Sequence, residues 1–472
     1  MWNLNINWLR ETAIEHQLGI DIDCYQLFAF LKSRYSGCYY FESLALPRHQ
    51  DRYFTLGFDP AFVINARGNI LEFSGDTEIL QKTTGQKNTG FVCASVDNPY
   101  HFLQRSDFTR SCRLQQGGLI GYFSHEAINY LEPSLQLPEH DDFSAFKLGF
   151  YYDGLIYDTT TGVLFYYSLY QDRIDLVKRL IAEASSYQLP TRLAKVDFIS
   201  NSVSQDQFIT AVNHTKEKIH RGFSFQAEVG FKSSYQISGD KLAIYHRLRQ
   251  INPSPYMFYV VFGEQELFGA SPEILISAKQ GRLLTTPTAG TIVRGKSKSE
   301  DMRLARQLLS DPKEISEHNM LVDLHRNDLA HVCRPDSVQV SDLMYIIKFS
   351  HVQHIVSDVV GTLRADKSAF DALAAIFPGG VVTGAPKIET IKIIAENEQA
   401  PRGPYGGAVG RFSFNGDCDF CLPIRSFFCA GENCFAQTSA GVVYDSVPEK
   451  EYREVTHKLA AMRQTLRELG GR

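Results

Sequence analysis

The first third of the chain is dominated by short stretches in which hydrophobic and polar residues alternate. This period of two predicts β-strands, and the Gly, Pro and Asn residues between the stretches predict tight turns. The strands are expected at 52–58, 118–123, 149–157 and 162–167. Strands joined by short turns pair as antiparallel sheets.

A helical period replaces this alternation at residues 172–185, where Ile174, Val177, Leu180 and Ile181 recur at helical spacing. Residues 188–206 are polar, contain a proline and lack any period. We interpret 188–203 as a linker, which divides the chain into an N-terminal region, 1–187, and a second region, 204–472.

The second region contains both periods. Ser204 has the residue type of an N-cap and predicts a helix that ends near Ile219, before Gly222. Further helices are expected at 300–309, 313–327, 369–376, 386–396 and 449–466, and strands at 225–229, 256–262, 273–277, 282–287, 407–414, 419–427 and 434–443. The whole pattern predicts an α+β protein with large antiparallel sheets and helices on their outer faces.

Composition and charge narrow the class of protein. Hydrophobic residues make up 44% and charged residues 21% of the chain, which excludes an intrinsically disordered protein. The 48 basic and 53 acidic residues nearly balance, so we expect no nucleic-acid partner. No signal peptide and no apolar run of about 20 residues is visible, so we expect no membrane association. Nine scattered cysteines favour a reducing, cytoplasmic location over a disulfide framework, and we expect no metal site at the isolated pair Cys418 and Cys421.

Two predicted helices each carry a pair of glutamates three residues apart. Glu314 and Glu317 share one helical face, and Glu451 and Glu454 share another, with Lys458 one turn further along. Two such faces brought together would form an oxygen-only site suited to Mg²⁺. The alternative is an ordinary solvated helix surface with ion pairs.

Several glycine-rich turns indicate places where a ligand could approach the backbone. Thr383 and Gly384 precede an Ala-Pro-Lys sequence at a predicted helix start, where free N–H groups bind anions. This turn lacks the Lys and Ser or Thr of a nucleotide-binding P-loop. Arg425 lies at a strand position that alternation turns inward, and a buried arginine requires a carboxylate, either from a ligand or from an internal salt bridge.

In these residues the second region resembles the chorismate-utilising enzyme family, which includes anthranilate synthase component I, aminodeoxychorismate synthase component I, and isochorismate and salicylate synthases. The resemblance covers roughly residues 204–465, and its motifs are Gly269-Ala270-Ser271-Pro272-Glu273, Pro287-Thr288-Ala289-Gly290-Thr291, Glu317-His318, Leu321-Val322-Asp323-Leu324-His325-Arg326-Asn327-Asp328, Phe377-Pro378-Gly379-Gly380, Thr383-Gly384-Ala385-Pro386-Lys387, Tyr405-Gly406-Gly407 and Asp445-Ser446. It implies a sandwich of large antiparallel sheets.

The resemblance also implies roles for individual residues. Glu317 and Glu454 would be direct Mg²⁺ ligands, with Glu314 and Glu451 nearby. Glu273 would be the general acid that protonates the departing C4 hydroxyl of chorismate. The remaining implied site residues are a histidine at the reacting ring, His354, two residues that hold the pyruvyl carboxylate, Tyr405 and Arg425, and further substrate contacts at Thr383, Gly384, Ala440, Gly441 and Lys458.

Two positions distinguish the reactions of this family. Gln226 stands where the water-using members have a lysine base, and an amide cannot deprotonate water. Ala289 stands where many aminodeoxychorismate synthases have a nucleophilic lysine, and alanine cannot form a covalent intermediate. The resemblance therefore favours direct amination at C2, followed by pyruvate elimination to anthranilate.

The N-terminal region resembles anthranilate synthases at Phe41-Glu42-Ser43, and its partner segment is Asn252-Pro253-Ser254-Pro255-Tyr256-Met257. In that family these segments line a pocket for the feedback inhibitor tryptophan, which implies contacts at Ser43, Pro255, Tyr256 and Met257. The alternative is a structural sheet edge.

Some residues depart from the anthranilate synthase pattern, among them Gly380, Thr383 and Ser439, the last of which replaces a common glycine. The expected function is nevertheless Mg²⁺-dependent conversion of chorismate to anthranilate, with aminodeoxychorismate synthesis as the alternative and a non-catalytic tryptophan-binding protein as a third possibility. The chain has no recognisable amidotransferase segment, so a separate glutamine amidotransferase subunit is expected to supply ammonia.

Overall fold

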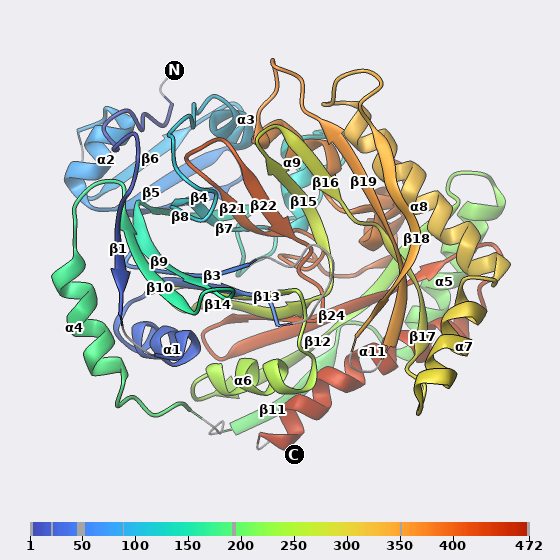
Figure 1. Ribbon diagram of the computed structural model, residues 1–472. Coiled ribbons are helices and arrows are strands. Elements are labelled where there is room, and N and C mark those ends of the chain that lie inside the picture. Colours follow the sequence, from blue (N-terminus) through green and yellow to red (C-terminus); the bar gives the residue numbers. More distant parts are fainter. Residues whose placement is uncertain are drawn as a thin grey trace.

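The computed structural model describes residues 3–19, 22–44, 52–87, 89–190, 195–349 and 352–469. Two large β-sheets lie face to face with helices on their outer sides (Figure 1), and every strand pairing among the described residues is antiparallel. The predicted α+β sandwich is therefore confirmed. None of the helices in the described ranges has both the length and the apolarity that a membrane span requires.

The first sheet draws its strands from both halves of the chain. In spatial order they are β1 (Ile14–Leu18), β10 (Val163–Ser168), β9 (Asp153–Asp158), β3 (Tyr53–Phe58), β2 (Gly37–Glu42), β13 (Tyr256–Phe262), β14 (Gln265–Ser271), β23 (Ser426–Ala430), β24 (Asn433–Val442), β12 (Gln226–Ser238) and β11 (Lys195–Asn201), with the short β20 (Gly384–Ala385) paired to β12.

The second sheet also draws its strands from both halves of the chain. Its order is β17 (Thr288–Val293), β19 (Val352–Thr362), β16 (Arg282–Thr285), β15 (Ile274–Lys279), β22 (Cys418–Cys421), β21 (Ala408–Phe412), β7 (Gly118–Phe123), β8 (Phe146–Tyr151), β4 (Phe62–Arg67), β5 (Ile70–Gly75) and β6 (Phe91–Ser95), with β18 (Gln339–Lys348) paired to β19.

Three apolar layers hold these sheets and their helices together. Side chains of β2, β13, β7 and β21 form the layer between the sheets. A second layer lies under the helices on the first sheet, α1 (Cys24–Arg34), α4 (Ile174–Ala184), α5 (Gln205–His220), α6 (Leu242–Ile251) and α11 (Pro448–Glu468). The third lies against the second sheet and includes residues of α2 (Thr77–Thr84), α3 (Pro99–Gln104), α8 (Pro312–Ala330), α9 (Ala369–Ile376) and α10 (Lys387–Asn397). Helix α7 (Lys298–Leu308) precedes α8, and η1 (His125–Tyr130) and η2 (Gly380–Val382) are short 3-10 turns.

Local chemistry explains where individual helices begin. The predicted N-cap of α5 is confirmed, because the Ser204 side chain accepts from the Gln207 N–H while the Gln207 side chain bonds back to the Ser204 backbone. Asp311 caps α8 by accepting from the backbone N–H groups of Lys313 and Glu314. This cap fixes the first turn of the helix that carries Glu314 and Glu317.

The chain differs from the prediction where it passes between the sheets. The single strand expected at 149–157 is two strands, β8 and β9, which belong to different sheets and meet at Tyr152. The strand expected at 419–427 is likewise divided into β22 and β23. Most residues of both segments are buried on either face, so hydrophobic alternation carries no signal for the change of sheet.

A strand also occupies part of the expected linker. Strand β11 pairs with β12 at the edge of the first sheet, with Phe198 and Ile199 largely exposed. No strand was predicted for these residues, because a solvent-exposed edge strand lacks the apolar alternation of a buried one. Residues 191–194, also in that expected linker, lie outside the described ranges.

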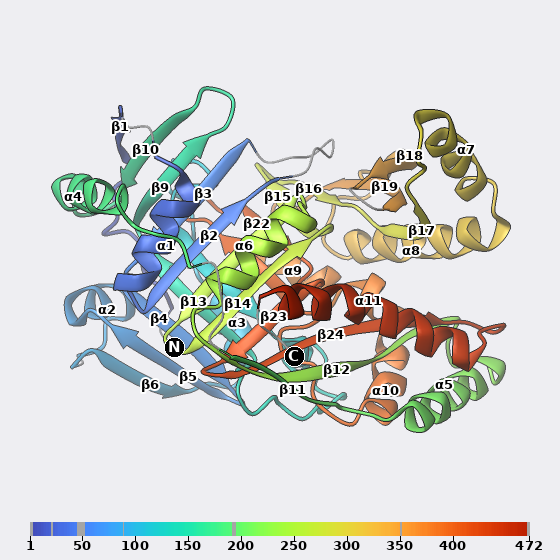
Figure 2. The same ribbon diagram turned by 90° about the horizontal axis from the view of Figure 1, so that it is seen from below.

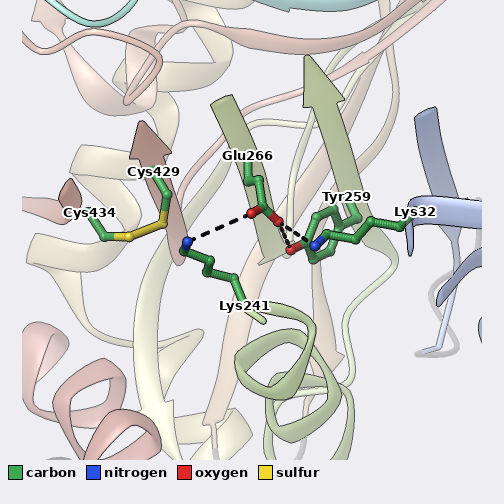
Figure 3. Close-up of a disulfide and its surroundings, with 6 residues drawn as sticks. All are labelled: Lys32, Lys241, Tyr259, Glu266, Cys429 and Cys434. Atoms are coloured by element: carbon green, nitrogen blue, oxygen red, sulfur yellow. Dashed lines mark hydrogen bonds and ion pairs between the residues drawn. A yellow bond between two sulfur atoms is a disulfide. The ribbon is translucent and has the colours of Figure 1, made fainter. Parts of the chain in front are cut away.

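One disulfide contradicts the expectation of reduced cysteines. Cys429 of β23 and Cys434 of β24 face each other across the strand pair and are bonded (Figure 3). Figure 3 also draws a neighbouring charge cluster, in which Glu266 lies 3.0 Å from Lys32 and accepts a hydrogen bond from Tyr259. The odd number of cysteines gave no sign of this pair, because the hairpin register alone brings them together. The thiols of Cys418 and Cys421 are free and buried.

Candidate active site

The candidate site lies where the ends of the two sheets face each other. One wall consists of β17, β19 and α8, and the other of β12, β24 and α11 (Figure 2). Helix α8 packs against β17 and β19, and α11 packs against β24. The two glutamate pairs therefore project from opposite walls.

Glu273 lies where the chain passes from β14 to β15. Its side chain is 3% exposed, and its carboxyl group accepts a hydrogen bond from the Thr288 backbone N–H. Burial raises the pKa of Glu273 well above its usual value, and the neighbouring Arg425 opposes this only in part. The carboxyl group is therefore suited to hold a proton and to donate it to a leaving group.

Arg425 lies in the connection between β22 and β23, at a φ of 51°, and not within a strand as predicted. Its Nη2 donates to His354 Nε2 over 3.4 Å, and no carboxylate of the described residues forms an ion pair with it. Burial lowers the pKa of Arg425, with Glu273 opposing. A buried guanidinium without an internal anion is a binding group for a ligand carboxylate.

His354 is a neutral acceptor on β19. Its Nδ1 lies 3.1 Å from the Gly290 carbonyl oxygen, which can only accept, so we assign the ring proton to Nδ1. Burial, together with Arg425, lowers the pKa of His354 to about 4. The Nε2 lone pair therefore faces Arg425 and accepts a hydrogen bond from its guanidinium.

The four glutamates face each other across the site but do not form a compact cluster. Burial and the charges of Glu314 and Glu228 raise the pKa of Glu317 to about 7. Burial also raises the pKa of Glu314, with a further contribution from Glu454 on the opposite wall. No three carboxylate, histidine or cysteine side chains of the described residues are close enough to hold an ion between them.

The donor chemistry of these glutamates nevertheless fits Mg²⁺. All are hard oxygen ligands, and Glu314 and Glu317 repel one another across a shared face. Lys313 is 3.7 Å from Glu317, and Lys458 is 2.8 Å from Glu454. Each wall therefore has one lysine as a local counter-charge.

On the other wall, a hydrogen-bonded chain includes a carboxylate that the sequence did not reveal. The Tyr405 hydroxyl lies 3.0 Å from Ser439 Oγ, and Ser439 donates to Glu228 Oε2 over 2.5 Å. Gln226, two residues before Glu228 on β12, donates to its other oxygen over 3.4 Å. The alternation around Gln226 could have indicated that Glu228 shares its face.

Small residues leave room for these side chains. A Cβ on Gly441 would lie 2.3 Å from Gln226 Nε2 and 2.8 Å from Glu228 Oε1. A Cβ on Gly384 would lie 2.0 Å from the Gln226 carbonyl oxygen, which explains how β20 can pair with β12. Gly384 is therefore required for this strand pairing, whereas a Cβ at Gly441 would displace the ends of the Gln226 and Glu228 side chains.

Three other predicted substrate contacts have structural partners. The Thr383 hydroxyl donates to the Gly379 carbonyl, and the Ala440 side chain lies in the core under the helices. Lys458 Nζ donates to the Ser439 carbonyl over 2.9 Å. Ala289 lies on β17 opposite Ile355, next to the bulge at Gly290.

The predicted inhibitor segments meet at neighbouring strand ends. Register places Met257 opposite Glu42, so Ser43 and Tyr256 come next to each other, with Pro255 buried beside them. The Met257 side chain lies in the core under the helices, whereas Tyr256 packs into the layer between the sheets.

Arg411 reaches the same intersheet layer and was not singled out from the sequence. Its side chain is 5% exposed, donates to the Thr55 hydroxyl and lies over the ring of Phe41. No carboxylate of the described residues pairs with it. A lone arginine at a strand position that alternates with apolar residues was the available signal.

Comparison with known proteins gives a consistent result. A model of the chorismate binding enzyme family matches residues 38–464. Anthranilate synthase component 1 of Leptospira biflexa is 40% identical over 452 residues, 95% of this chain and 94% of that protein. The corresponding protein of Methanothermobacter thermautotrophicus is 38% identical over 95% of this chain and 92% of its own length.

Solved structures show the same fold. The crystal structure of anthranilate synthase component I from Streptococcus pneumoniae superposes with a TM-score of 0.75 at 31% identity, covering 89% of this chain and 94% of that one. A menaquinone-specific isochorismate synthase from Escherichia coli shares the fold at 18% identity and a TM-score of 0.70, covering 96% of this chain and 94% of that one. Because the family model spans residues 38–464 and these relatives match nearly the whole chain, this chain belongs to the family of chorismate binding enzymes.

Proposed function

We propose that the protein converts chorismate and ammonia into anthranilate, pyruvate and water. The observation that carries this proposal is the combination of a buried acid, Glu273, with an arginine, Arg425, that forms no ion pair with any carboxylate of the described residues. The relatives named anthranilate synthase component 1 support it over nearly the whole chain.

Each side chain of the site has its own role in this reaction. Arg425 and the Tyr405 hydroxyl hold the pyruvyl carboxylate, and Lys458 attracts the dianionic substrate. Glu273 donates its proton to the C4 hydroxyl, which leaves as water when nitrogen adds at C2. His354 then accepts the proton from C2 as pyruvate is eliminated and the ring becomes aromatic, because its Nε2 carries a lone pair. Gln226 lies by the attacking nitrogen, and Ala289 provides no competing nucleophile.

We further propose Mg²⁺ as the cofactor. Glu317 and Glu454 would hold it directly, with Glu314 and Glu451 next to them, and its charge would stabilise the ring carboxylate. Closer approach of α8 and α11 is required for all four to surround one ion, because in the structure they project from opposite walls.

Ammonia and location complete the proposal. A separate glutamine amidotransferase subunit is the proposed source of ammonia, and the cytoplasm the proposed location. The test is to combine the purified protein with chorismate, Mg²⁺ and an ammonium salt and to separate the products. Fluorescent anthranilate and an equal amount of pyruvate are expected. Aminodeoxychorismate, detected as 4-aminobenzoate after a lyase is added, would contradict the assignment and would point to residues such as Gly380 and Thr383 as the better guide.

Feedback inhibition by tryptophan is the proposed role of the intersheet layer around Ser43 and Tyr256. Ser43 and Tyr256 would contact the amino acid, and Arg411 would bind its carboxylate. Arg411→Gln should weaken inhibition by tryptophan without changing the rate of the uninhibited enzyme. Unchanged inhibition in that variant would exclude this contact.

A further inference from the structure

Strand β12 places two polar side chains together at the wall of the site. Gln226 and Glu228 are two residues apart, so both project from one face of the strand. The ends of their side chains lie over Gly441, where a Cβ would displace them. The space left by this glycine is therefore filled by an amide and a carboxylate.

These side chains offer hydrogen-bond acceptors that the protein does not use fully. Gln226 is 8% exposed, and its Oε1 has no partner among the described residues. The Nε2 of the same amide reaches Glu228 Oε1, so the unpaired oxygen lies beside that carboxylate. A buried acceptor without a donor is costly, which indicates that a donor from outside the chain binds here.

Glu228 also lacks an ion-pair partner in the described part of the chain. The nearby cations are committed elsewhere, since Lys458 is 2.8 Å from Glu454 and Arg402 is 2.6 Å from Glu398. The other charged or titratable groups facing Glu228 are Glu454, Glu317 and Tyr405. Burial raises the pKa of Glu228, with Lys458 opposing. The local charge therefore favours a small cation that donates hydrogen bonds.

We propose that Gln226 and Glu228 form the subsite for the nitrogen nucleophile, in which ammonium donates to Gln226 Oε1 and Glu228 Oε1. This assignment rests on the function proposed above. In the reaction, ammonium gives one proton to Glu228, and the freed lone pair forms the N–C2 bond. The ring electrons shift, the C4–O bond breaks, and Glu273 protonates the hydroxyl, which leaves as water. Glu228 has then gained the proton that Glu273 has lost, and solvent restores both.

Glu228→Gln tests the assignment, because it removes the charge and keeps the shape. The KM for ammonium should rise about tenfold near neutral pH, roughly the value of a hydrogen bond to a charged group. The KM for chorismate and the Mg²⁺ requirement should stay the same. The difference in this KM between the wild type and Glu228→Gln should become smaller as pH rises, because free ammonia replaces ammonium. Glu432→Gln, in the exposed hairpin between β23 and β24, is the matched control.

A binding measurement keeps the test independent of turnover. Ammonium chloride should raise the thermal midpoint of the wild-type protein above that in sodium chloride at equal ionic strength. The increase should disappear in Glu228→Gln and persist in Glu432→Gln, and Glu228→Asp should restore it in part, which also guards against misfolding of the first variant.

Each contrary outcome has a distinct meaning. Equal midpoints in the two salts, or an unchanged KM for ammonium in a folded Glu228→Gln, would overturn the subsite even if the wild type makes anthranilate. A raised Mg²⁺ requirement with an unchanged KM for ammonium would also overturn it and would make Glu228 a metal ligand. An ammonium-specific midpoint shift without anthranilate formation would support the subsite and contradict the proposed function.

Discussion

Replacement of Arg425 by methionine should weaken substrate binding and stabilise the protein at the same time. Methionine has a similar length but no charge, so Arg425→Met removes the two charge-assisted hydrogen bonds that the guanidinium would make to a carboxylate. At about 1.5 kcal/mol or more for each bond, the KM for chorismate should rise roughly 100-fold. Among the described residues, the only protein hydrogen bond lost is the 3.4 Å contact with His354.

The same substitution removes a cationic group whose burial is not compensated by any ion pair in the described residues. The free energy of unfolding should therefore increase, by about 1–4 kcal/mol if the site behaves like other buried ionic groups replaced by apolar ones.

Steady-state kinetics and urea unfolding measure the two effects, with Arg453→Met on the exposed side of α11 as the control. A loss of stability without a change in the KM for chorismate would refute the reasoning, because it would make Arg425 a structural residue.

Three further predictions concern the acid, the glycine and the cysteines. Glu273→Gln should lower kcat about 10²–10⁴-fold. A raised pKa keeps Glu273 protonated until the pH reaches that pKa, so the wild-type rate should fall at higher pH. A variant with the wild-type kcat and the same fall in rate at high pH would exclude Glu273 as the acid. Gly441→Ala should lower activity at least tenfold with little change in melting, whereas Gly19→Ala, where nothing lies within 4 Å, should change neither. Thiol titration of the denatured protein should count seven free cysteines before reduction and nine after it, and nine at the outset would exclude the Cys429–Cys434 bond.

Helices and strands that a local sequence pattern marks were predicted, whereas features that depend on how strands pair were not. The helix that starts after Ser204 and the strand of Tyr256 were predicted, because caps and apolar runs are local signals. The change of sheet at Tyr152 was not, because both strands are buried on both faces and show no alternation. Glu228 was missed for a related reason, since its importance depends on Ser439, which pairing brings from more than 200 residues away.

The site residues Glu273 and Arg425 both lie at places where the chain leaves one sheet for the other. These two passages are hydrogen-bonded to each other, from the Leu422 N–H to the Glu273 carbonyl and from the Ala270 N–H to the Arg425 carbonyl. Together they connect the two sheets, and they carry the acid and the anion-binding group.

Connections of this kind are displaced when the distance between the two sheets changes. A molecule bound between the sheets near Tyr256 or Arg411 would increase the distance between the sheets and displace both connections. Through these two connections, the proposed inhibition by tryptophan between the sheets would act on both the acid and the anion-binding group.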